Sequence, residues 1–448
     1  MFAFTLLLAS TLILGEDDHS WDHASVSAYA VNTVTGEVVF DENSDKSLTP
    51  ASCMKVVTTG AAYYLLGPES HFQTDLEYDG VIDKGVLHGN VYIRGGGDPC
   101  LGSNRIAPSL AWDQQIDSWV SALQNLGIHT IEGTVYGDAS KWEKAMAPAS
   151  WMWEDLGNYY GAGASALSFH ENAYSLVFKP SPKIGESAAI VRTDPPLPSL
   201  LFQNEVATGD VGSGDRACIY GSEFSPVQYV RGTVPAGVPE FAIKGAIPDP
   251  AAFCAKLLID ALQRKLTIQH QPIPEQKKKT TVYTTLSPTI REIVHQTNQK
   301  SINLYAEHLM KKMGEVVYQV GSTEAGTKAI TEFWRWQGID LDGFKMADGS
   351  GNSRKNLATA KQFVAILSKL KQSEFFPLFN DSLVPLKDNI RVKSGSMGYV
   401  RGYVGYAGDV AFAVIVNNCL DPEMNNKIKK FLSNSFSNVG HTASRDLQ

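Results

Sequence analysis

A serine and a lysine three residues apart stand near the start of an otherwise uncharged segment, TPASCMKVVTTGAAYYLLG, residues 49–67. Thr49 and Pro50 are typical of a helix start, with Thr49 as the predicted N-cap. On that helix Ser52 and Lys55 would share one face within side-chain reach. A serine hydroxyl becomes a good nucleophile when a base removes its proton, and a lysine can be that base when burial lowers its pKa. The pair therefore predicts nucleophilic catalysis, with Ser52 as nucleophile and Lys55 as general base.

A second lysine, Lys393, begins the string Lys-Ser-Gly-Ser in a predicted strand, IRVKSGS, near the C-terminus. The hydroxyls of Ser394 and Ser396, together with the Lys393 ammonium, are suited to hold the terminal carboxylate of a peptide. Gly395 has no side chain, so an extended substrate could pair alongside this strand edge. A second cation close to Lys55 would also lower the pKa of that lysine further.

A third string, Ser-x-Asn, places Ser301 and Asn303 at the start of the predicted helix LYAEHLMKKM. Each string alone is weak, because Ser-x-Asn recurs at residues 350–352 and Ser-x-x-Lys recurs at residues 368–371 in a predicted surface helix. A lone match fits a simple N-cap or a polar strand as well as it fits catalysis. In this order, however, the three strings match the motif set of the penicillin-recognising serine enzymes.

Two separate stretches of the chain must supply the elements that position these strings. A predicted hairpin at residues 25–40 and the strands after residue 390 suit a single sheet beside a helical cluster. Between them, residues 71–240 change to short strands and Gly-rich turns, with one clear amphipathic helix at about 109–126. The pattern predicts an α+β fold made by residues 20–70 and 241–448, interrupted by a β-rich insertion at 71–240.

Composition narrows the classes of partner. The chain has 448 residues, 43% of them hydrophobic, and a net charge of −8 with no basic stripe. An acidic balance of this kind argues against nucleic-acid binding. Five scattered cysteines (Cys53, Cys100, Cys218, Cys254 and Cys419) show no metal-ligand spacing and define no disulfide. We therefore expect no metal, no cofactor and no nucleic acid.

The N-terminus predicts export. Residues 2–15, FAFTLLLASTLILG, are apolar but too short to span a bilayer of about 30 Å, and acidic residues follow at once. This is typical of a secretory signal at residues 1–15, with a buried strand or a retained anchor as the alternatives. We therefore expect a periplasmic or secreted protein whose mature chain has no transmembrane segment.

The sequence resembles the D-alanyl-D-alanine carboxypeptidase/endopeptidase family of class C low-molecular-mass penicillin-binding proteins, peptidase family S13. The resemblance extends over nearly the whole chain beyond the signal. It rests on TPASCMKVVTTGAAYYLLG, VYIRGGGDPCLG, YYGAGASALSFHENAYSLVFKP, KSINLYAEHLMKKMG, MADGSGNSRKNL and RVKSGSMGYVRGYVGY. It implies a penicillin-binding, transpeptidase-like catalytic domain with two β-rich domains inserted after the nucleophile helix.

The resemblance also implies a two-step acyl transfer on peptidoglycan stem peptides, at D-Ala-D-Ala or D-Ala-diaminopimelate bonds. Backbone N–H groups of Ser52 and Ser396 would bind the oxyanion, and Ser301 would relay a proton to the leaving amine. β-Lactam antibiotics would acylate the same serine and leave slowly. The implied catalytic residues are Ser52, Lys55, Ser301, Asn303 and Lys393, and the implied substrate-binding residues are Ser394, Gly395 and Ser396.

Two departures and two alternatives accompany this prediction. Ile302 stands where Asp or Asn is usual, and Lys-Ser-Gly-Ser replaces Lys-Thr-Gly-Thr, which keeps both hydroxyls. We expect Ile302 to alter substrate fit rather than to abolish catalysis. The alternatives are a β-lactamase, which would turn over a penicillin rapidly, and a non-catalytic peptidoglycan-binding protein, which would release no D-alanine.

Overall fold

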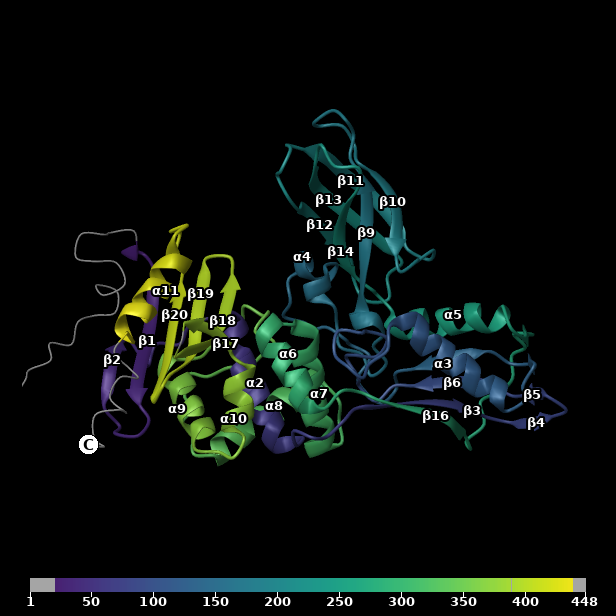
Figure 1. Ribbon diagram of the computed structural model, residues 1–448, viewed down its shortest axis with the longest axis horizontal. Coiled ribbons are helices and arrows are strands. Elements are labelled where there is room, and N and C mark those ends of the chain that lie inside the picture. Colours follow the sequence, from purple (N-terminus) through teal and green to yellow (C-terminus); the bar gives the residue numbers. More distant parts are fainter. Residues whose placement is uncertain (1–20, 388, 438–448) are drawn as a thin grey trace, which may run out of the picture. The chain divides into compact units, whose positions relative to one another are not determined.

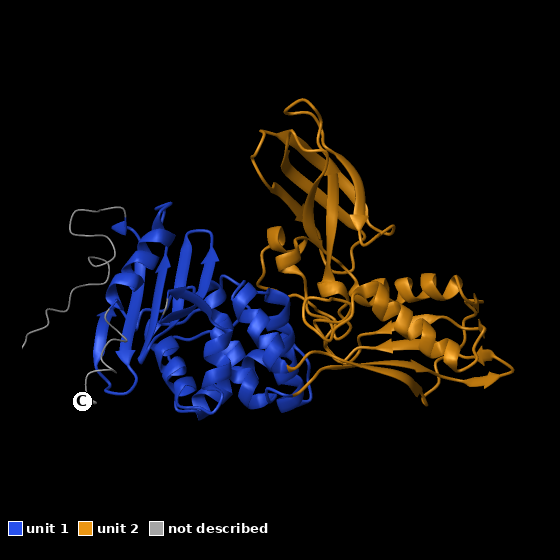
Figure 2. Ribbon diagram, in the orientation of Figure 1, with its two compact units in different colours: residues 1–69, 290–448 blue, residues 70–289 orange. Residues whose placement is uncertain are grey.

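The computed structural model describes residues 21–387 and 389–437, which fall into two units (Figure 2). Unit 1 takes residues 1–69 and 290–448, and unit 2 takes residues 70–289. The secretory signal predicted at residues 1–15 lies outside the described residues.

Unit 1 is built on a six-stranded antiparallel sheet to which both ends of the chain contribute (Figure 1). Its strand order is β17-β18-β19-β20-β1-β2. The strands are β1 (Ser25–Asn32), β2 (Val38–Glu42), β17 (Val384–Lys387), β18 (Ile390–Met397), β19 (Val400–Ala407) and β20 (Val410–Asn417). All eight residues of β20 are buried, as expected for the uninterrupted apolar run VAFAVIV at the centre of a sheet covered on both faces.

Helices cover both faces of this sheet (Figure 1). Helix α11 (Met424–Ser435) packs on one face, where Ile428 and Phe431 join a core with Phe40 and Phe412. The other helices gather on the opposite side, with α9 against β1, β19 and β20. They are η2 (Ala51–Cys53), α2 (Met54–Leu65), α6 (Ile290–Lys300), α7 (Asn303–Tyr318), α8 (Thr323–Trp336), α9 (Ala360–Lys371) and α10 (Phe376–Ser382).

Unit 2 contains four small sheets, β16-β3-β6-β8, β15-β7-β5-β4, β10-β9-β14 and β11-β13-β12. The strands of the first two sheets are β3 (Gln73–Tyr78), β4 (Val81–Asp83), β5 (Val86–His88), β6 (Val91–Arg94), β7 (Thr130–Ile131), β8 (Val135–Asp138), β15 (Thr267–Ile268) and β16 (Thr280–Leu286). Those of the other two are β9 (Ala173–Lys179), β10 (Ala189–Asp194), β11 (Leu201–Gly209), β12 (Arg216–Tyr220), β13 (Val227–Pro235) and β14 (Phe241–Ala246). The helices of this unit are α3 (Trp112–Asn125), α4 (Trp153–Leu156), η3 (Tyr159–Gly161), η4 (His170–Asn172) and α5 (Pro250–Gln263).

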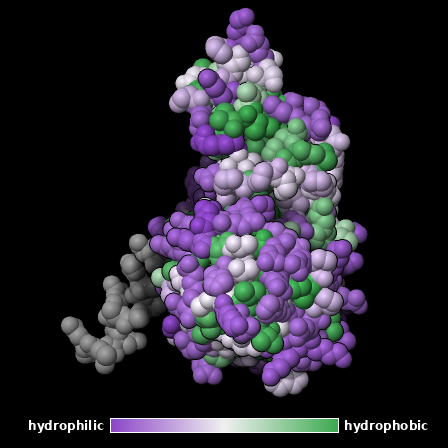
Figure 3. Space-filling model, turned by 90° about the vertical axis from the view of Figure 1, so that its right-hand side faces the viewer, coloured by the Kyte–Doolittle hydropathy of each residue, from purple (hydrophilic) through white to green (hydrophobic). Residues whose placement is uncertain are grey.

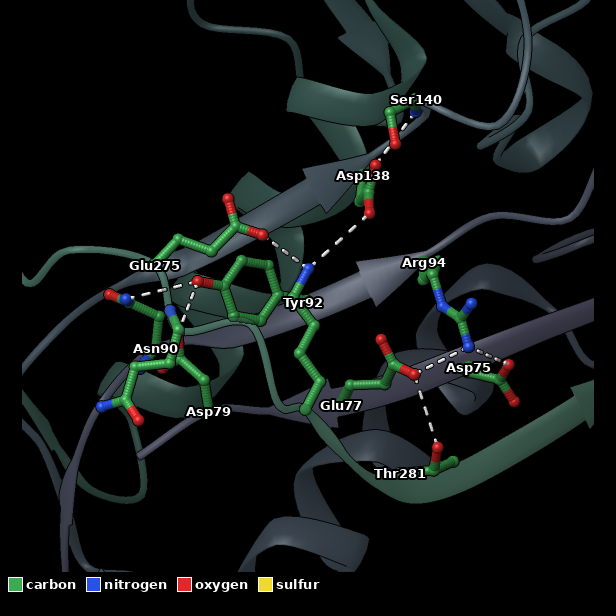
Figure 4. Close-up of polar contacts among 12 residues, drawn as sticks. Asp75, Glu77, Asp79, Asn90, Tyr92, Arg94, Asp138, Ser140, Glu275 and Thr281 are labelled. Atoms are coloured by element: carbon green, nitrogen blue, oxygen red, sulfur yellow. Dashed lines mark hydrogen bonds and ion pairs between the residues drawn. The ribbon is translucent and has the colours of Figure 1, made fainter. Parts of the chain in front are cut away.

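The sheet β16-β3-β6-β8 has one apolar and one charged face, as alternation along its strands requires. The apolar face lies in the core of unit 2 and includes Leu76, Ile93 and Val135. The charged face carries Asp75 and Glu77 on β3 opposite Arg94 and Tyr92 on β6 (Figure 4).

The second boundary of the insertion differs from the prediction. Unit 2 continues to residue 289, whereas the predicted insertion ended at residue 240. Helix α5 packs against α3 and β8, and β16 pairs with β3 along its whole length. Residues 241–289 therefore return to the insertion, because a helical period in the sequence does not reveal which sheet the helix will cover.

No helix within residues 21–387 and 389–437 is long and apolar enough to cross a membrane. Figure 3 shows one face of the molecule, which is mostly hydrophilic, with hydrophobic residues gathered in a few patches, chiefly in the upper part of the view.

Candidate active site

Ser52 lies in a tight turn at the start of the buried helix α2. The turn is the 3-10 helix η2, and the residue before it, Pro50, takes the cap position without a side-chain hydrogen bond. Thr49 is therefore not the N-cap that the sequence predicts. Its backbone N–H instead donates to Asn417 Oδ1 at 2.9 Å, and its carbonyl accepts from Asn417 Nδ2 at 2.9 Å. These two bonds fix the segment before Ser52 to the central strand β20.

Lys55 is fully buried in the first turn of α2. Its Nζ lies 3.0 Å from Ser52 Oγ, 2.6 Å from Asn303 Oδ1 and 2.7 Å from the carbonyl oxygen of Ser350. All three partners are neutral groups. These three bonds hold the amine beside the serine hydroxyl, and none of them is made to a carboxylate.

Burial is the main reason that the pKa of Lys55 falls well below its ordinary value of 10.5. The ammonium of Lys393 lowers the pKa of Lys55 further, as the sequence predicts for a second cation nearby. Asp348, Glu307 and Cys53 act in the opposite direction. The site thus favours the neutral amine that a general base needs.

Lys393 lies on β18 and is 1% exposed. Its Nζ donates to Ser301 Oγ at 2.9 Å and to the carbonyl of Ser394 at 2.7 Å. Ser301 follows α6 in a left-handed conformation, with φ at +56°, and precedes the first residue of α7, Asn303. Burial lowers the pKa of Lys393 to about 8. The three strings of the sequence thus meet as two lysine–serine pairs, Lys55 with Ser52 and Lys393 with Ser301.

The hydroxyl-bearing strand β18 presents Ser394 and Ser396 to solvent on alternate positions. Ser396 Oγ accepts a hydrogen bond from Arg401 Nη1 on β19, where the two residues are direct partners across the hairpin. Arg401 lies outside the three strings and was not among the predicted site residues. A hairpin turn placed at residues 398–399 would have set residue 401 opposite residue 396 and is the signal that could have found it.

Gly395 lies directly against the turn that carries Ser52. A Cβ atom at this position would lie 2.5 Å from the carbonyl oxygen of Pro50 and 2.9 Å from the backbone nitrogen of Cys53. Such distances leave no room for any side chain. The glycine therefore lets the Ser52 turn pack directly against β18.

Among the described residues, the two rival strings, residues 350–352 and 368–371, do not form the predicted side-chain contacts. Asn303, and not Asn352, contacts the Lys55 amine, while Ser350 contributes its backbone carbonyl to that amine. In the other Ser-x-x-Lys string, Lys371 donates to Asp409 Oδ1 at 2.8 Å and to the carbonyl of Gly408. That lysine is paired at the end of a surface helix, as its amphipathic pattern suggests.

The described cysteines are all free thiols, and no group of three or more His, Cys, Asp or Glu side chains in the described part of the chain is arranged to hold a metal ion. The chemistry available at the site is that of a hydroxyl beside a neutral amine, with a second hydroxyl beside a buried lysine. Such an arrangement suits acyl transfer through a covalent serine intermediate.

Comparison with solved structures shows that this is a penicillin-binding fold. Penicillin binding protein 4 (dacB) from Haemophilus influenzae shares the fold, with a TM-score of 0.78 at 22% identity over 95% of this chain and 97% of that one. A second structure of the same protein, complexed with a novel β-lactam, has a TM-score of 0.73 at 21% identity, again over 95% and 97% of the two chains. The predicted fold class is therefore confirmed.

The D-Ala-D-Ala carboxypeptidase 3 (S13) family matches residues 15–439, and the chain belongs to this family. The D-alanyl-D-alanine carboxypeptidase of Actinomadura sp. (strain R39) is 24% identical over 442 residues, which cover 91% of this chain and 80% of that protein. D-alanyl-D-alanine carboxypeptidase DacB of Haemophilus influenzae is 25% identical over 437 residues, which cover 91% and 88%. The predicted family and enzyme class, a serine-type D,D-peptidase, are confirmed.

Proposed function

We propose that Ser52 is the nucleophile and Lys55 the general base of a D-Ala-D-Ala carboxypeptidase. The observation that carries this proposal is the 3.0 Å contact between Lys55 Nζ and Ser52 Oγ in a site that depresses the pKa of the lysine. The amine takes the hydroxyl proton as Oγ bonds to the carbonyl carbon of the penultimate D-alanine. The tetrahedral intermediate then collapses to an acyl-serine and a free D-alanine.

The second lysine–serine pair serves the leaving group. Ser301 Oγ passes a proton to the departing amine nitrogen, and Lys393, 2.9 Å away, holds that hydroxyl and supplies positive charge. Asn303 orients Lys55 through its 2.6 Å bond and has an amide for the substrate backbone. Backbone N–H groups of Ser52 and Ser396 stabilise the oxyanion, a contribution of about 3 kcal/mol for a single donor. Water then hydrolyses the acyl-serine, with the same base removing its proton.

The face of β18 that carries the exposed Ser394 and Ser396 binds the peptide substrate. Ser394 and Ser396 offer hydroxyls to its terminal carboxylate, and Arg401 beside Ser396 adds a fixed positive charge. Gly395 contributes by bringing the strand against the nucleophile turn. A free carboxylate at the end of the substrate is what such a site would select.

Peptidoglycan stem peptides are the proposed substrates, and β-lactams the proposed inhibitors, which acylate Ser52 and are released slowly. Crystallisation of the Haemophilus influenzae relative with a β-lactam supports the second part. Because such substrates lie outside the cytoplasmic membrane, we also propose an exported, periplasmic or secreted protein. The predicted signal at residues 1–15 is the basis of this part.

Digestion of purified peptidoglycan by wild type and Ser52→Ala, followed by muropeptide analysis, tests the proposal. We expect the wild type to remove terminal D-alanine and the variant to leave the muropeptides unchanged. A labelled penicillin should remain bound to the wild type for minutes, whereas rapid turnover would identify a β-lactamase. Absence of D-alanine release by the wild type would leave only a peptidoglycan-binding protein.

A further inference from the structure

A fourth segment of the chain reaches Lys55 besides the three recognised strings. It is the loop MADGSGNSRKN, residues 346–356, whose Ser350 carbonyl oxygen lies 2.7 Å from Lys55 Nζ. The loop is buried at Asp348, Ser350 and Ser353. Side chains of Asp348 and Glu307 hold this loop beside Lys55 through hydrogen bonds to its backbone.

Asp348 holds the peptide group that contacts the lysine. The carbonyl of Ser350 and the N–H of Gly351 belong to one peptide unit, and that N–H donates to Asp348 Oδ1 at 2.8 Å. The unit is therefore hydrogen-bonded at both ends, with a carboxyl behind it and the Lys55 amine in front. Bonds in such a chain polarise one another, which strengthens the carbonyl as an acceptor.

Glu307 holds the preceding peptide group. Its Oε1 accepts from the N–H of Ser350 at 2.7 Å, and the side chain is fully buried. Glu307 lies four residues after Asn303 on α7, so the two share one face of the helix. One helix thus approaches the lysine twice, directly through Asn303 and indirectly through Glu307 and Ser350.

The loop is also shaped to the nucleophile turn. Gly351 has φ at +83°, and a Cβ there would lie 1.9 Å from the carbonyl oxygen of Ala51, next to Ser52. Thr58 Oγ1, on α2, donates to the carbonyl of Gly349 at 2.6 Å. These contacts fix the position in which the loop packs against η2 and α2.

The position of the loop, and so of the Ser350 carbonyl oxygen, affects the direction of the lone pair of Lys55. A neutral amine has two N–H groups and one lone pair. Asn303 Oδ1 and the carbonyl oxygen of Ser350 can only accept hydrogen bonds. If the two N–H groups go to these oxygens, the lone pair faces the remaining neighbour, the hydroxyl of Ser52. After proton transfer the ammonium has three N–H groups and three acceptors.

We propose that Asp348 and Glu307 are positioning residues that, through the Ser350 peptide, aim the lone pair of Lys55 at the Ser52 hydroxyl. The inference rests on the proposed function of Ser52 and Lys55. It assigns the loop 346–356 to the reaction through its backbone, because the N–H groups of Ser350 and Gly351 donate to Glu307 and Asp348.

The test compares D-alanine release from a pentapeptide ending in D-Ala-D-Ala, as kcat/KM against pH, in four variants. Asp348→Asn removes the charge behind the peptide, and Asp340→Asn removes one exposed charge from the same unit as the control. Glu307→Leu removes the acceptor of the Ser350 N–H, whereas Glu307→Gln keeps an oxygen for it. Thermal unfolding of each variant reports whether it folds.

For Asp348→Asn we expect the acidic limb of the profile to move to lower pH by about one unit. The charged and titratable groups that face Lys55 are Lys393, Asp348, Glu307 and Cys53, and the charge on Asp348 raises the pKa of Lys55. Removing that charge leaves more neutral amine at a given pH, so the limb moves down. The plateau should fall about 10- to 100-fold because the amine is less well aimed.

For the Glu307 pair we expect a fall of about tenfold or more in Glu307→Leu and recovery of most of that loss in Glu307→Gln. A folded Asp348→Asn with an unmoved limb, or a Gln variant as impaired as the Leu variant, would overturn the inference while the wild type still releases D-alanine. If Asp348→Asn does not fold, the Glu307 pair decides. A wild type that releases no D-alanine would overturn the proposed function and this inference together.

Discussion

Two groups of buried or partly buried cations, one in each unit, have opposite kinds of neighbour. In unit 2, Lys279 Nζ lies 2.8 Å from Glu275, 3.9 Å from Asp138 and 3.9 Å from the centre of the Tyr92 ring. Arg94 bridges Asp75 and Glu77 in the same cluster (Figure 4). In unit 1, the neighbours of Lys55 and Lys393 are hydroxyls, a side-chain amide and backbone carbonyls.

The difference shows that the neighbours of a buried cation decide how well its charged form is stabilised. A carboxylate or an aromatic face stabilises the charged form of a cation that has lost part of its water. Neutral acceptors compensate less, so burial drives the pKa of Lys55 and Lys393 down. We expect Lys55 and Lys393 to take part in the reaction, and Lys279 and Arg94 to contribute to local stability.

The largest expected effect comes from Lys55→Met, which keeps most of the side-chain volume and removes the amine. The value of kcat/KM for D-alanine release should fall about 10²- to 10⁴-fold, the range that a general base contributes. The matched variant Lys279→Met should stay within about twofold of wild type. Equal losses in the two variants would break the comparison.

The next effect is the basic limb of the pH profile. The pKa of Lys393 is about 8, so its positive charge is lost as pH rises through that value. If the charge is needed for the leaving group and the carboxylate, kcat/KM should fall above about pH 8. In Lys393→Arg the charge persists, because a guanidinium titrates above about pH 12, and the limb should disappear even if the plateau is lower. A limb that stays near pH 8 in the arginine variant would assign it to another group.

Stability should change in opposite directions in the two units. Lys393 has a pKa of about 8 in the folded state against an ordinary value of 10.5, so its burial opposes folding below about pH 8. This penalty, about 3 kcal/mol, is relieved as pH rises from about 8 to about 10.5, because the unfolded chain then holds more protons. Lys393→Met should therefore raise the free energy of unfolding at pH 7 by about 1–3 kcal/mol even though it lowers activity. Lys279→Met should lower it by about 1 kcal/mol, as measured by urea denaturation.

The smallest effect is expected at Ile302, between the two site residues Ser301 and Asn303. Ile302 occupies the N-cap position of α7 without a side-chain hydrogen bond. Ile302→Asn should supply that cap and raise the free energy of unfolding by about 1 kcal/mol. We expect kcat to stay within about twofold and KM to change by about threefold or less. A collapse of kcat would show that this side chain takes part in the reaction.

Local spacing explains why part of the site could be read from the sequence. Ser52 and Lys55 are three residues apart, and any helical geometry brings their side chains together. The approach of Lys393 and Ser301 followed from the order of three strings and from the family resemblance, which carried information that spacing alone does not hold.

Tertiary register explains what the sequence did not reveal. Arg401 meets Ser396 because of a particular hairpin register, and Asp348 acts on Lys55 through the backbone of its own loop. Backbone carbonyls such as that of Ser350 have no sequence signature at all. For the same reason the helix at residues 250–263 was assigned to the wrong unit, since its amphipathic face is compatible with either core.

The two points at which the chain leaves unit 1 for the insertion and returns to it lie next to each other in space. The N–H of Arg291 donates to the carbonyl of Pro68 at 2.9 Å, and within the insertion Gln73 pairs with Leu286. Ser52 precedes the insertion in the chain, whereas β18, which lies beside it, follows the insertion, so Ser52 is synthesised first and β18 only after the insertion. Because domains generally fold in the order in which they are made, the insertion has time to fold while Ser52 still lacks its partners. A nascent or truncated chain that stops before β18 would carry the serine and remain inert.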